Sequence, residues 1–281
     1  MPDFICVGPG RTATSWLRSV LAPHVCLPRG IRETRFWGQL YYKGIDFYAA
    51  HFADSEPTRP AGEICPYFPD SIARERIAHY IPNCRIVVTL RDPVERSYSQ
   101  YRRFRSRAIA YHPFELALEK HPRIIETNRY AHHLGGWIDS FGRENVLVML
   151  FDELQYDPQN FVDRVCAFIG ISSIDLTRTR PGTRDINADR QMPRSDKLAR
   201  AGSRLIEFMY RRSLYRGIDL VERTRLYDFF FSGGKAYPPL APDLDARIRA
   251  KMIPEIKAVE ALTGFDLSHW KGSPARSQAI A

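Results

Sequence analysis

The sequence predicts an α/β fold with a mostly parallel β-sheet flanked by helices. Three short runs have the apolar, β-branched character of buried strands. Amphipathic helical patterns lie between and after these runs. Strands that alternate with helices favour parallel pairing, because each return to the same edge of the sheet needs a crossover connection.

The three predicted strands differ in length and in how apolar they are. The first is Phe4 to Val7, close to the start of the chain. The second, Arg85 to Leu90, is apolar after its first residue and β-branched in its middle. The third runs from Asn145 to Phe151. All three are short enough for strands and too short for independent helices.

The helical patterns have apolar residues at spacings of three and four. In the last of them Asp243 and Asp245 lie near the start, and Gly264 is placed to end the helix. The apolar positions that define the four helices are Trp16, Leu17, Val20 and Leu21; Tyr130, Leu134, Trp137, Ile138 and Phe141; Phe161, Val162, Val165, Phe168 and Ile169; and Leu244, Ile248, Met252, Ile256, Val259 and Leu262.

A polar stretch rich in Arg, Asp, Pro and Thr interrupts the pattern from about residue 172 to 203. It is too long for an ordinary connection, and such loops are typical of lids or of irregular segments. We expect a single domain over residues 1–272, with residues 187–194 in a lid-like loop, and a C-terminal tail over residues 273–281.

Composition indicates a folded protein that binds anions. The 281 residues are 44% hydrophobic and 26% charged, with a formal net charge of +9 in which arginine dominates the basic side. Arginine chelates phosphate and sulfate with a two-pronged geometry. Nucleic acid is a weaker alternative, since the arginines are dispersed and no nucleic-acid motif accompanies them. With no uncharged apolar run of membrane-spanning length and no leader-like start, we expect a cytoplasmic protein without a membrane segment.

The five cysteines are widely spaced and mostly set among apolar residues. There is no CxxC pair and no Cys/His cluster with metal-ligand spacing. We therefore expect reduced cysteines that pack as small hydrophobic residues, and no metal.

A glycine-containing turn follows the first strand and precedes the first helix. In this arrangement backbone N–H groups and the helix dipole converge on an anion. Arg11 supplies charge, and the candidate ligand-binding residues are Gly10, Arg11, Thr12, Ala13, Thr14 and Ser15. The ATP-binding spacing GxxxxGK[ST] is absent, which argues against a nucleoside-triphosphate hydrolase. A turn that merely joins a strand to a helix remains the alternative.

A second candidate anion site follows the second predicted strand. Asp92 can cap a helix there and Pro93 can open it. Arg91 then lies at the carboxyl end of the strand, and Ser99 lies two turns along the helix, eight residues later. We expect both to reach one anion at the ligand-binding edge of the sheet. The alternative, a capped helix with solvated arginines, suits Arg96, Arg102 and Arg103.

These segments resemble the PAPS-dependent sulfotransferases (PAPS is 3'-phosphoadenosine 5'-phosphosulfate), in a bacterial type related to the heparan sulfate and Golgi-type branch. The family has an Arg-Asp-Pro…Ser helix with the spacing seen here. The resemblance covers about Phe4 to Trp270, with a P-loop-like fold, and the further matching segments are Arg32 to Trp37, Gly62 to Tyr67, Leu150 to Leu154 and Gly264 to Trp270.

The resemblance implies a role for each motif. The glycine loop binds the 5'-phosphosulfate of PAPS, Arg91 and Ser99 bind the 3'-phosphate, and PAP is the product. Glu33 is the general base and Arg11 stabilises the leaving phosphate, with no metal required. Arg11 stands where the family usually has lysine, and Ala13 where it usually has glycine.

Several alternatives stay open from the sequence. One is a non-catalytic PAP- or PAPS-binding protein, and another is a nucleotide kinase-like P-loop protein. The acceptor is a hydroxyl or amine of a small molecule, a glycan or a lipid, and the oligomeric state is open. Aromatic stretches at Phe36-Trp37 and Phe229 to Phe231 suit an acceptor cleft or, more often, a core. We expect solvated or packing roles for His24, His79 and His112.

Overall fold

The computed structural model describes residues 1–178 and 191–272. Its contacts divide the chain into two compact units, each assembled from separate stretches of sequence. The first unit comprises Met1–Arg91, His133–Ala188 and Arg204–Tyr227, and the second comprises Asp92–His132, Asp189–Ser203 and Asp228–Ala281. The predicted tail, residues 273–281, lies outside the described residues, so the predicted domain boundary stays a prediction.

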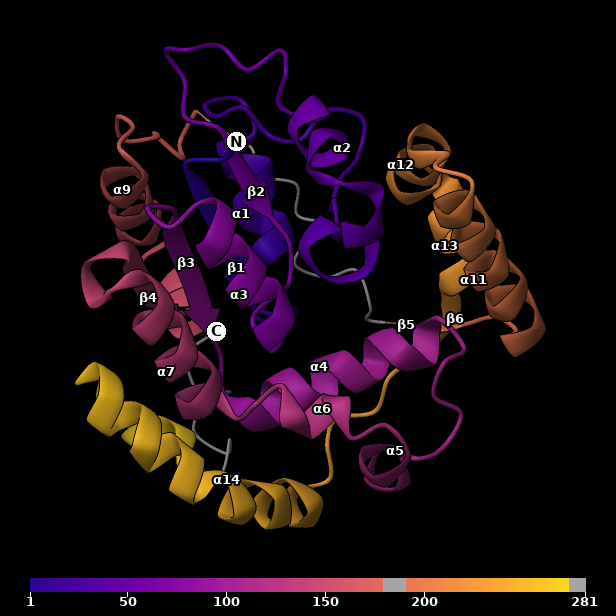
Figure 1. Cartoon of the computed structure of the whole chain (residues 1–281). Helices are drawn as coiled ribbons and strands as arrows, with labels where there is room; N and C mark the ends of the chain where they lie inside the picture. The colour runs from indigo at the N-terminus through magenta and orange to yellow at the C-terminus, as the bar shows by residue number, and fades with distance from the viewer. Residues whose placement is uncertain (179–190, 273–281) are drawn as a thin grey trace. The chain divides into compact units, whose positions relative to one another are not determined.

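A four-stranded parallel sheet forms the centre of the first unit (Figure 1). Its strands are β1 (Phe4–Gly8), β2 (Gly62–Ile64), β3 (Arg85–Leu90) and β4 (Val146–Leu150), in the order β2-β1-β3-β4. The predicted α/β class and the three predicted strands are confirmed. Sequence patterning missed β2, because it has three residues and a glutamate at its centre.

The strand order places a topological switch point between β1 and β3. β1 pairs with β2 on one side and with β3 on the other, and the chain visits β2 before it returns to β3. In open parallel sheets, ligands bind outside the carboxyl ends of the strands at such a point. The segments that leave β1 and β3, which begin at Pro9 and Arg91, therefore lie at the edge of the sheet where the sequence predicts anion binding.

Helices α1 and α9 cover one face of this sheet. Their apolar residues form a single buried cluster with Phe4 and Cys6 of β1, Val87 of β3 and Met149 of β4. Alternate residues of each strand point to this face, as strand geometry requires. The helical segments of the first unit are α1 (Thr14–Leu21), η1 (Phe36–Leu40), η2 (Tyr41–Lys43), α2 (Ile45–Ala50), α3 (Ser71–Tyr80), η3 (Arg143–Asn145), α8 (Phe151–Tyr156), α9 (Pro158–Ile169) and α12 (Tyr215–Arg223).

The second unit is mostly helical and has its own apolar core. Val94 of α4, Phe114 of α5 and Ile124 of α6 pack with Ile248 of α14. A two-stranded antiparallel sheet of β5 and β6 belongs to this unit. Its elements are α4 (Pro93–Ser106), α5 (Phe114–Lys120), α6 (Arg123–Glu126), β5 (Gln191–Pro193), β6 (Gly233–Ala236), α14 (Pro242–Thr263) and η4 (Ser268–Trp270), while α7 (Tyr130–Phe141), α11 (Asp196–Arg211) and α13 (Arg225–Phe231) contribute residues to both units.

The late polar stretch contains more regular structure than the sequence indicated. Strand β5 lies within it, and α11 begins at Asp196, so the prediction of an irregular segment as far as residue 203 is wrong. The first turns of α11 carry mainly charged and small residues, of which Ala199 is buried, so they lack an obvious apolar stripe. Residues 187–190 of the predicted lid lie outside the described residues.

The aromatic stretches are largely core. Phe36, Trp37 and Tyr48 are fully buried, with Phe36 stacked on Tyr48 and Trp37 edge-on to both. Phe231 is buried, while Phe229 is half exposed. Four of the five cysteines are buried thiols, as the packing interpretation expects. None of the helices in the described residues combines the length and the hydropathy that a membrane span needs.

Candidate active site

The loop after β1 is shaped by residues in the left-handed region of backbone space. Gly8 has φ +87°, and a Cβ there would lie 2.9 Å from the Gly10 nitrogen, so only glycine fits. Arg11 (φ 78°) and Ala13 (φ 64°) adopt the same region, which costs energy for any residue with a Cβ. Strain of this kind is concentrated at functional sites.

Thr12 holds this loop together from within. Its side chain is buried, and its hydroxyl donates a hydrogen bond to the Pro9 carbonyl at 2.6 Å. The hydroxyl predicted to face a ligand therefore has a structural partner. Thr14 and Ser15, at the start of α1, are partly exposed.

The N-terminus of α1 has no side-chain cap. The N-cap position is Ala13, which forms no side-chain hydrogen bond, and the first turn holds no acidic residue. Helices of this kind present their first amides, together with the positive end of the dipole, to an anion. At Gly10 the nearest atom to an added Cβ would be 3.8 Å away, so the loop has room for close approach to its backbone.

Arg91 joins this loop at the carboxyl end of β3. Its Nη1 donates a hydrogen bond to the Arg11 carbonyl at 3.4 Å, and its guanidinium lies 4.4 Å from the centre of the Phe151 ring. Two motifs 80 residues apart in the sequence are thus adjacent at the switch point of the sheet. Both belong to the first unit.

Ser99 lies on α4 in the second unit and is 2% exposed. Its partnership with Arg91 on one anion stays a prediction. The start of its helix agrees with the sequence, since Oδ1 of Asp92 accepts hydrogen bonds from the amides of Val94 and Glu95, and Pro93 occupies the first turn.

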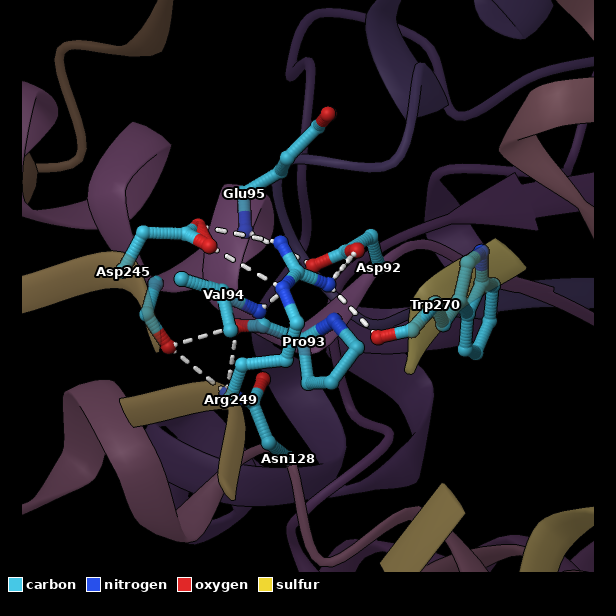
Figure 2. A network of polar contacts seen from close by, with 9 residues as sticks. Asp92, Pro93, Val94, Glu95, Asn128, Asp245, Arg249 and Trp270 are labelled. Atoms are coloured by element: carbon cyan, nitrogen blue, oxygen red, sulfur yellow. Dashed lines mark hydrogen bonds and ion pairs between the residues drawn. The ribbon is translucent and has the colours of Figure 1, made fainter. Parts of the chain in front are cut away.

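The other oxygen of Asp92 belongs to a buried polar network (Figure 2). Arg249 of α14 donates to Asp92 Oδ2, to both oxygens of Asp245 at 3.0 Å, and to the Trp270 carbonyl at 2.6 Å. Burial raises the pKa of Asp92, and the Arg249 charge opposes that rise. The network ties the start of α4 to α14 and η4 within the second unit.

The prediction of a solvated Arg96 is wrong. Its side chain is 1% exposed and donates to the Asn128 side chain and the Ile124 carbonyl. Asn128 also donates to the Pro93 carbonyl at 2.8 Å and to Ser97 at 2.6 Å. These groups are buried at the contact between α4 and α6, where polar atoms need internal partners.

Glu33 lies in the segment between α1 and η1, in the first unit. Its carboxylate is 3.5 Å from the Arg35 guanidinium. Both side chains are partly exposed, Glu33 to 31% and Arg35 to 40% of their surface. Arg35 also stacks over the Tyr210 ring at 4.7 Å. On the other side of Glu33, Arg18 of α1 donates to the Arg32 carbonyl at 2.7 Å.

A buried carboxylate behind this segment escaped the sequence reasoning. Glu63 of β2 is fully buried and accepts hydrogen bonds from Thr34, Tyr48 and Tyr67. The resemblance marked the segment from Gly62 to Tyr67, without a role for its glutamate. A charged residue inside a three-residue strand was the one available signal.

Three histidines are left without a role by the sequence. His24, His79 and His112 are exposed, which fits the solvated interpretation. Within the described part of the chain, no group of three or more His, Cys, Asp or Glu side chains is arranged to hold a metal ion.

The family model described as the sulfotransferase domain matches residues 1–181, which is more than half of the chain. The chain belongs to the sulfotransferase domain family. It is therefore a sulfotransferase-domain enzyme, and the matched region includes the loop after β1, the Glu33 segment and Arg91.

Curated relatives share part of this domain. The chain is 26% identical over 190 residues to the bifunctional heparan sulfate N-deacetylase/N-sulfotransferase 1 of Caenorhabditis elegans, and 27% identical over 198 residues to N-deacetylase/N-sulfotransferase 4 of Mus musculus. Each alignment covers 61% of this chain and 22% of the relative. The chain thus spans about a fifth of the length of these bifunctional proteins.

A solved structure supports the fold along nearly the whole chain. The sulfotransferase from Alicyclobacillus acidocaldarius is 23% identical, with a TM-score of 0.69 over 97% of this chain and 99% of that one. At this identity the likeness establishes the α/β sulfotransferase fold.

Proposed function

We propose that this enzyme transfers a sulfuryl group from PAPS to a hydroxyl or amine of a small-molecule, glycan or lipid acceptor, with Glu33 as general base. The observation that carries the proposal is the convergence of the loop after β1 and Arg91 at the switch point of the sheet. Family membership supplies the reaction class.

The donor's 5'-phosphosulfate fits the loop and the N-terminus of α1. The uncapped amides around Thr12 to Ser15 and the charge of Arg11 are the donors that such an anion requires. Thr12 contributes its amide, since its hydroxyl already donates to Pro9. The room at Gly10 permits the close backbone approach that a phosphate group needs.

Arg91 and Ser99 are the proposed ligands of the donor's 3'-phosphate. Arg91 leaves β3 beside the loop and donates to the Arg11 carbonyl, so it supplies positive charge next to the proposed 5'-phosphosulfate site. Asp92 caps the helix that carries Ser99 and accepts hydrogen bonds from the Val94 and Glu95 amides, so the proposed ligand on this helix is the Ser99 hydroxyl.

The chemistry asks the protein for placement and charge. The acceptor oxygen or nitrogen forms a bond to sulfur as the bond from sulfur to the 5'-phosphate oxygen breaks, and PAP leaves with that electron pair. Arg11 and the loop amides stabilise the developing charge on the phosphate. Glu33 takes the acceptor's proton, and Arg35 beside it orients the carboxylate.

The test is transfer of radiolabelled sulfate from PAPS to 4-nitrophenol, glucosamine and 1-octanol, which represent phenolic, sugar and lipid-like acceptors. Glu33→Gln should lower kcat by about 10²–10⁴-fold, the usual contribution of a general base, with PAP affinity unchanged. Glu56→Gln, an exposed glutamate of the same unit, is the matched control and should retain activity.

Two results would contradict the proposal. PAP binding with no labelled acceptor would favour a non-catalytic nucleotide-binding protein. Full activity of Glu33→Gln would remove Glu33 as the base.

A further inference from the structure

Glu63 sits at the centre of a hydroxyl cluster in the first unit. Its Oε1 accepts from the Thr34 hydroxyl at 2.5 Å and from Tyr67 at 3.2 Å, and its Oε2 accepts from Tyr48 at 2.7 Å. Glu63, Thr34 and Tyr48 are fully buried, and Tyr67 nearly so. Three segments distant in sequence meet at this one carboxylate.

Burial of the Glu63 carboxyl group costs free energy of folding. Burial raises the pKa of Glu63, and the hydrogen bonds from Thr34, Tyr48 and Tyr67 oppose that rise. The described donors to the Glu63 carboxyl group are hydroxyls and a backbone amide, and none of them is cationic. A buried carboxyl group without an opposite charge is an unfavourable choice for stability alone.

The cluster fixes the backbone next to Glu33. Thr34 follows Glu33 directly, and its Oγ1 also accepts a hydrogen bond from the Phe36 amide at 3.2 Å. Between them Arg35 adopts the left-handed region, with φ 50°. The tight turn over residues 34–36 is therefore held from the side of β2, through Thr34.

A second residue of the β2 segment faces the same turn. Burial raises the pKa of the Cys65 thiol, and the nearby Glu63 and Glu33 carboxylates raise it further, while a hydrogen bond with the Arg35 backbone opposes these effects. One thiol thus lies near both carboxylates. The backbone before Glu33 is held as well, because Arg18 donates a hydrogen bond to the Arg32 carbonyl.

We propose that Glu63 is a positioning residue, which fixes through Thr34 the backbone that places the Glu33 carboxylate against the acceptor. The inference rests on the proposed function, in which Glu33 is the base. Misplacement of a catalytic group by about 1 Å is enough to cost about 10²-fold in rate, so a rigid support next to Glu33 has a catalytic purpose.

The decisive comparison is Thr34→Val against Tyr48→Phe. Each variant removes one hydroxyl donor from Glu63, but only Thr34 is adjacent to Glu33 in the sequence. Thr34→Val should lower kcat by about 10–100-fold with the KM for PAPS little changed, as supporting residues of active sites do. Tyr48→Phe should keep kcat within about threefold of the wild-type value. Thr34→Ser retains the hydroxyl and should have a kcat close to that of wild type.

A readout independent of turnover accompanies the kinetics. Hydrogen exchange at the amides of residues 33–36 should accelerate in Thr34→Val and stay near the wild-type rate in Tyr48→Phe. Glu63→Gln keeps an oxygen that can accept from Thr34 and should stay active, whereas Glu63→Leu should lose activity. Thermal unfolding of every variant separates loss of folding from loss of positioning.

The outcomes separate this inference from the proposed function. If wild type labels an acceptor and Glu33→Gln does not, while Thr34→Val and Tyr48→Phe lower kcat equally, the positioning role fails and the base assignment stands. Unchanged exchange at residues 33–36 in Thr34→Val also overturns the positioning role. If wild type labels no acceptor, or if Glu33→Gln is fully active, the proposed function fails and the inference fails with it.

Discussion

At the scale of single residues, the loop after β1 carries unusual backbone conformations. Arg11 and Ala13 both have positive φ, at 78° and 64°. Ala13 stands where resembling sequences usually have glycine, and its conformation gives the physical reason for that preference. The chain accepts the strain at the N-terminus of α1, where backbone amides must face one way.

Replacement of Ala13 by glycine should leave stability unchanged or raise it by up to about 1.6 kcal/mol. Relief of about 1–2 kcal/mol of left-handed strain offsets the added entropy of the unfolded chain, about 0.4–1 kcal/mol. Urea denaturation measures the difference. Ala22→Gly is the matched control, because Ala22 ends the same helix with φ −52°.

Ala22→Gly should cost about 0.5–1 kcal/mol, since glycine gains nothing at an ordinary helical position. Equal destabilisation by the two glycine variants would show that the loop stores no strain at Ala13.

At the scale of elements, α4 depends on a helix that is far away in the sequence. One oxygen of Asp92 caps α4, and the other accepts from Arg249 of α14. Asp245 and the Trp270 carbonyl complete the partners of that guanidinium. A single arginine therefore connects the cap of α4, the body of α14 and the end of the described chain (Figure 2).

Arg249→Met should lower the free energy of unfolding by about 3–5 kcal/mol, because it leaves Asp92 and Asp245 buried without a compensating charge. The neighbouring Arg247, whose side chain is 58% exposed and paired with Glu115, offers a control on the same helix.

Arg247→Met should change stability by no more than about 0.5 kcal/mol, as exposed ion pairs contribute little. Urea denaturation of both variants is the measurement. Similar losses would mean that the buried network is not what holds α14 to the start of α4.

At the scale of the whole molecule, donor binding should raise the free energy of unfolding. A ligand that binds only the folded state adds about 2.7 kcal/mol at a concentration of 100 times its Kd. The loop after β1 and Arg91, which carry most of the proposed donor contacts, belong to the first unit. Thermal unfolding with nucleotide therefore reports on donor binding there.

PAP should raise the thermal midpoint of wild type more than adenosine 5'-phosphate does, because only PAP carries the 3'-phosphate. Arg91→Ala should remove most of that difference and leave the shift with adenosine 5'-phosphate nearly intact, since the loop after β1 is unchanged. An equal loss for both nucleotides would contradict a 3'-phosphate role for Arg91.

Much of the fold was accessible to sequence patterning, since it depends on local signals. The runs at β1, β3 and β4 are apolar because these strands are buried. The cap at Asp92 and the helix stop at Gly264, with φ 77°, follow from backbone chemistry within a few residues. Polar or mixed composition concealed β2 and the first turns of α11.

The candidate site divides in the same way. The sequence by itself pointed to the loop after β1 and Arg91 as candidates through short motifs, and to Glu33 through the family resemblance. Only the tertiary structure decided that Arg91 meets the Arg11 carbonyl, that Glu63 lies behind Thr34, and that Arg249 completes the cap of α4. These contacts join residues that are far apart in the sequence, and a polar side chain reveals a buried partner only when the fold brings the two together.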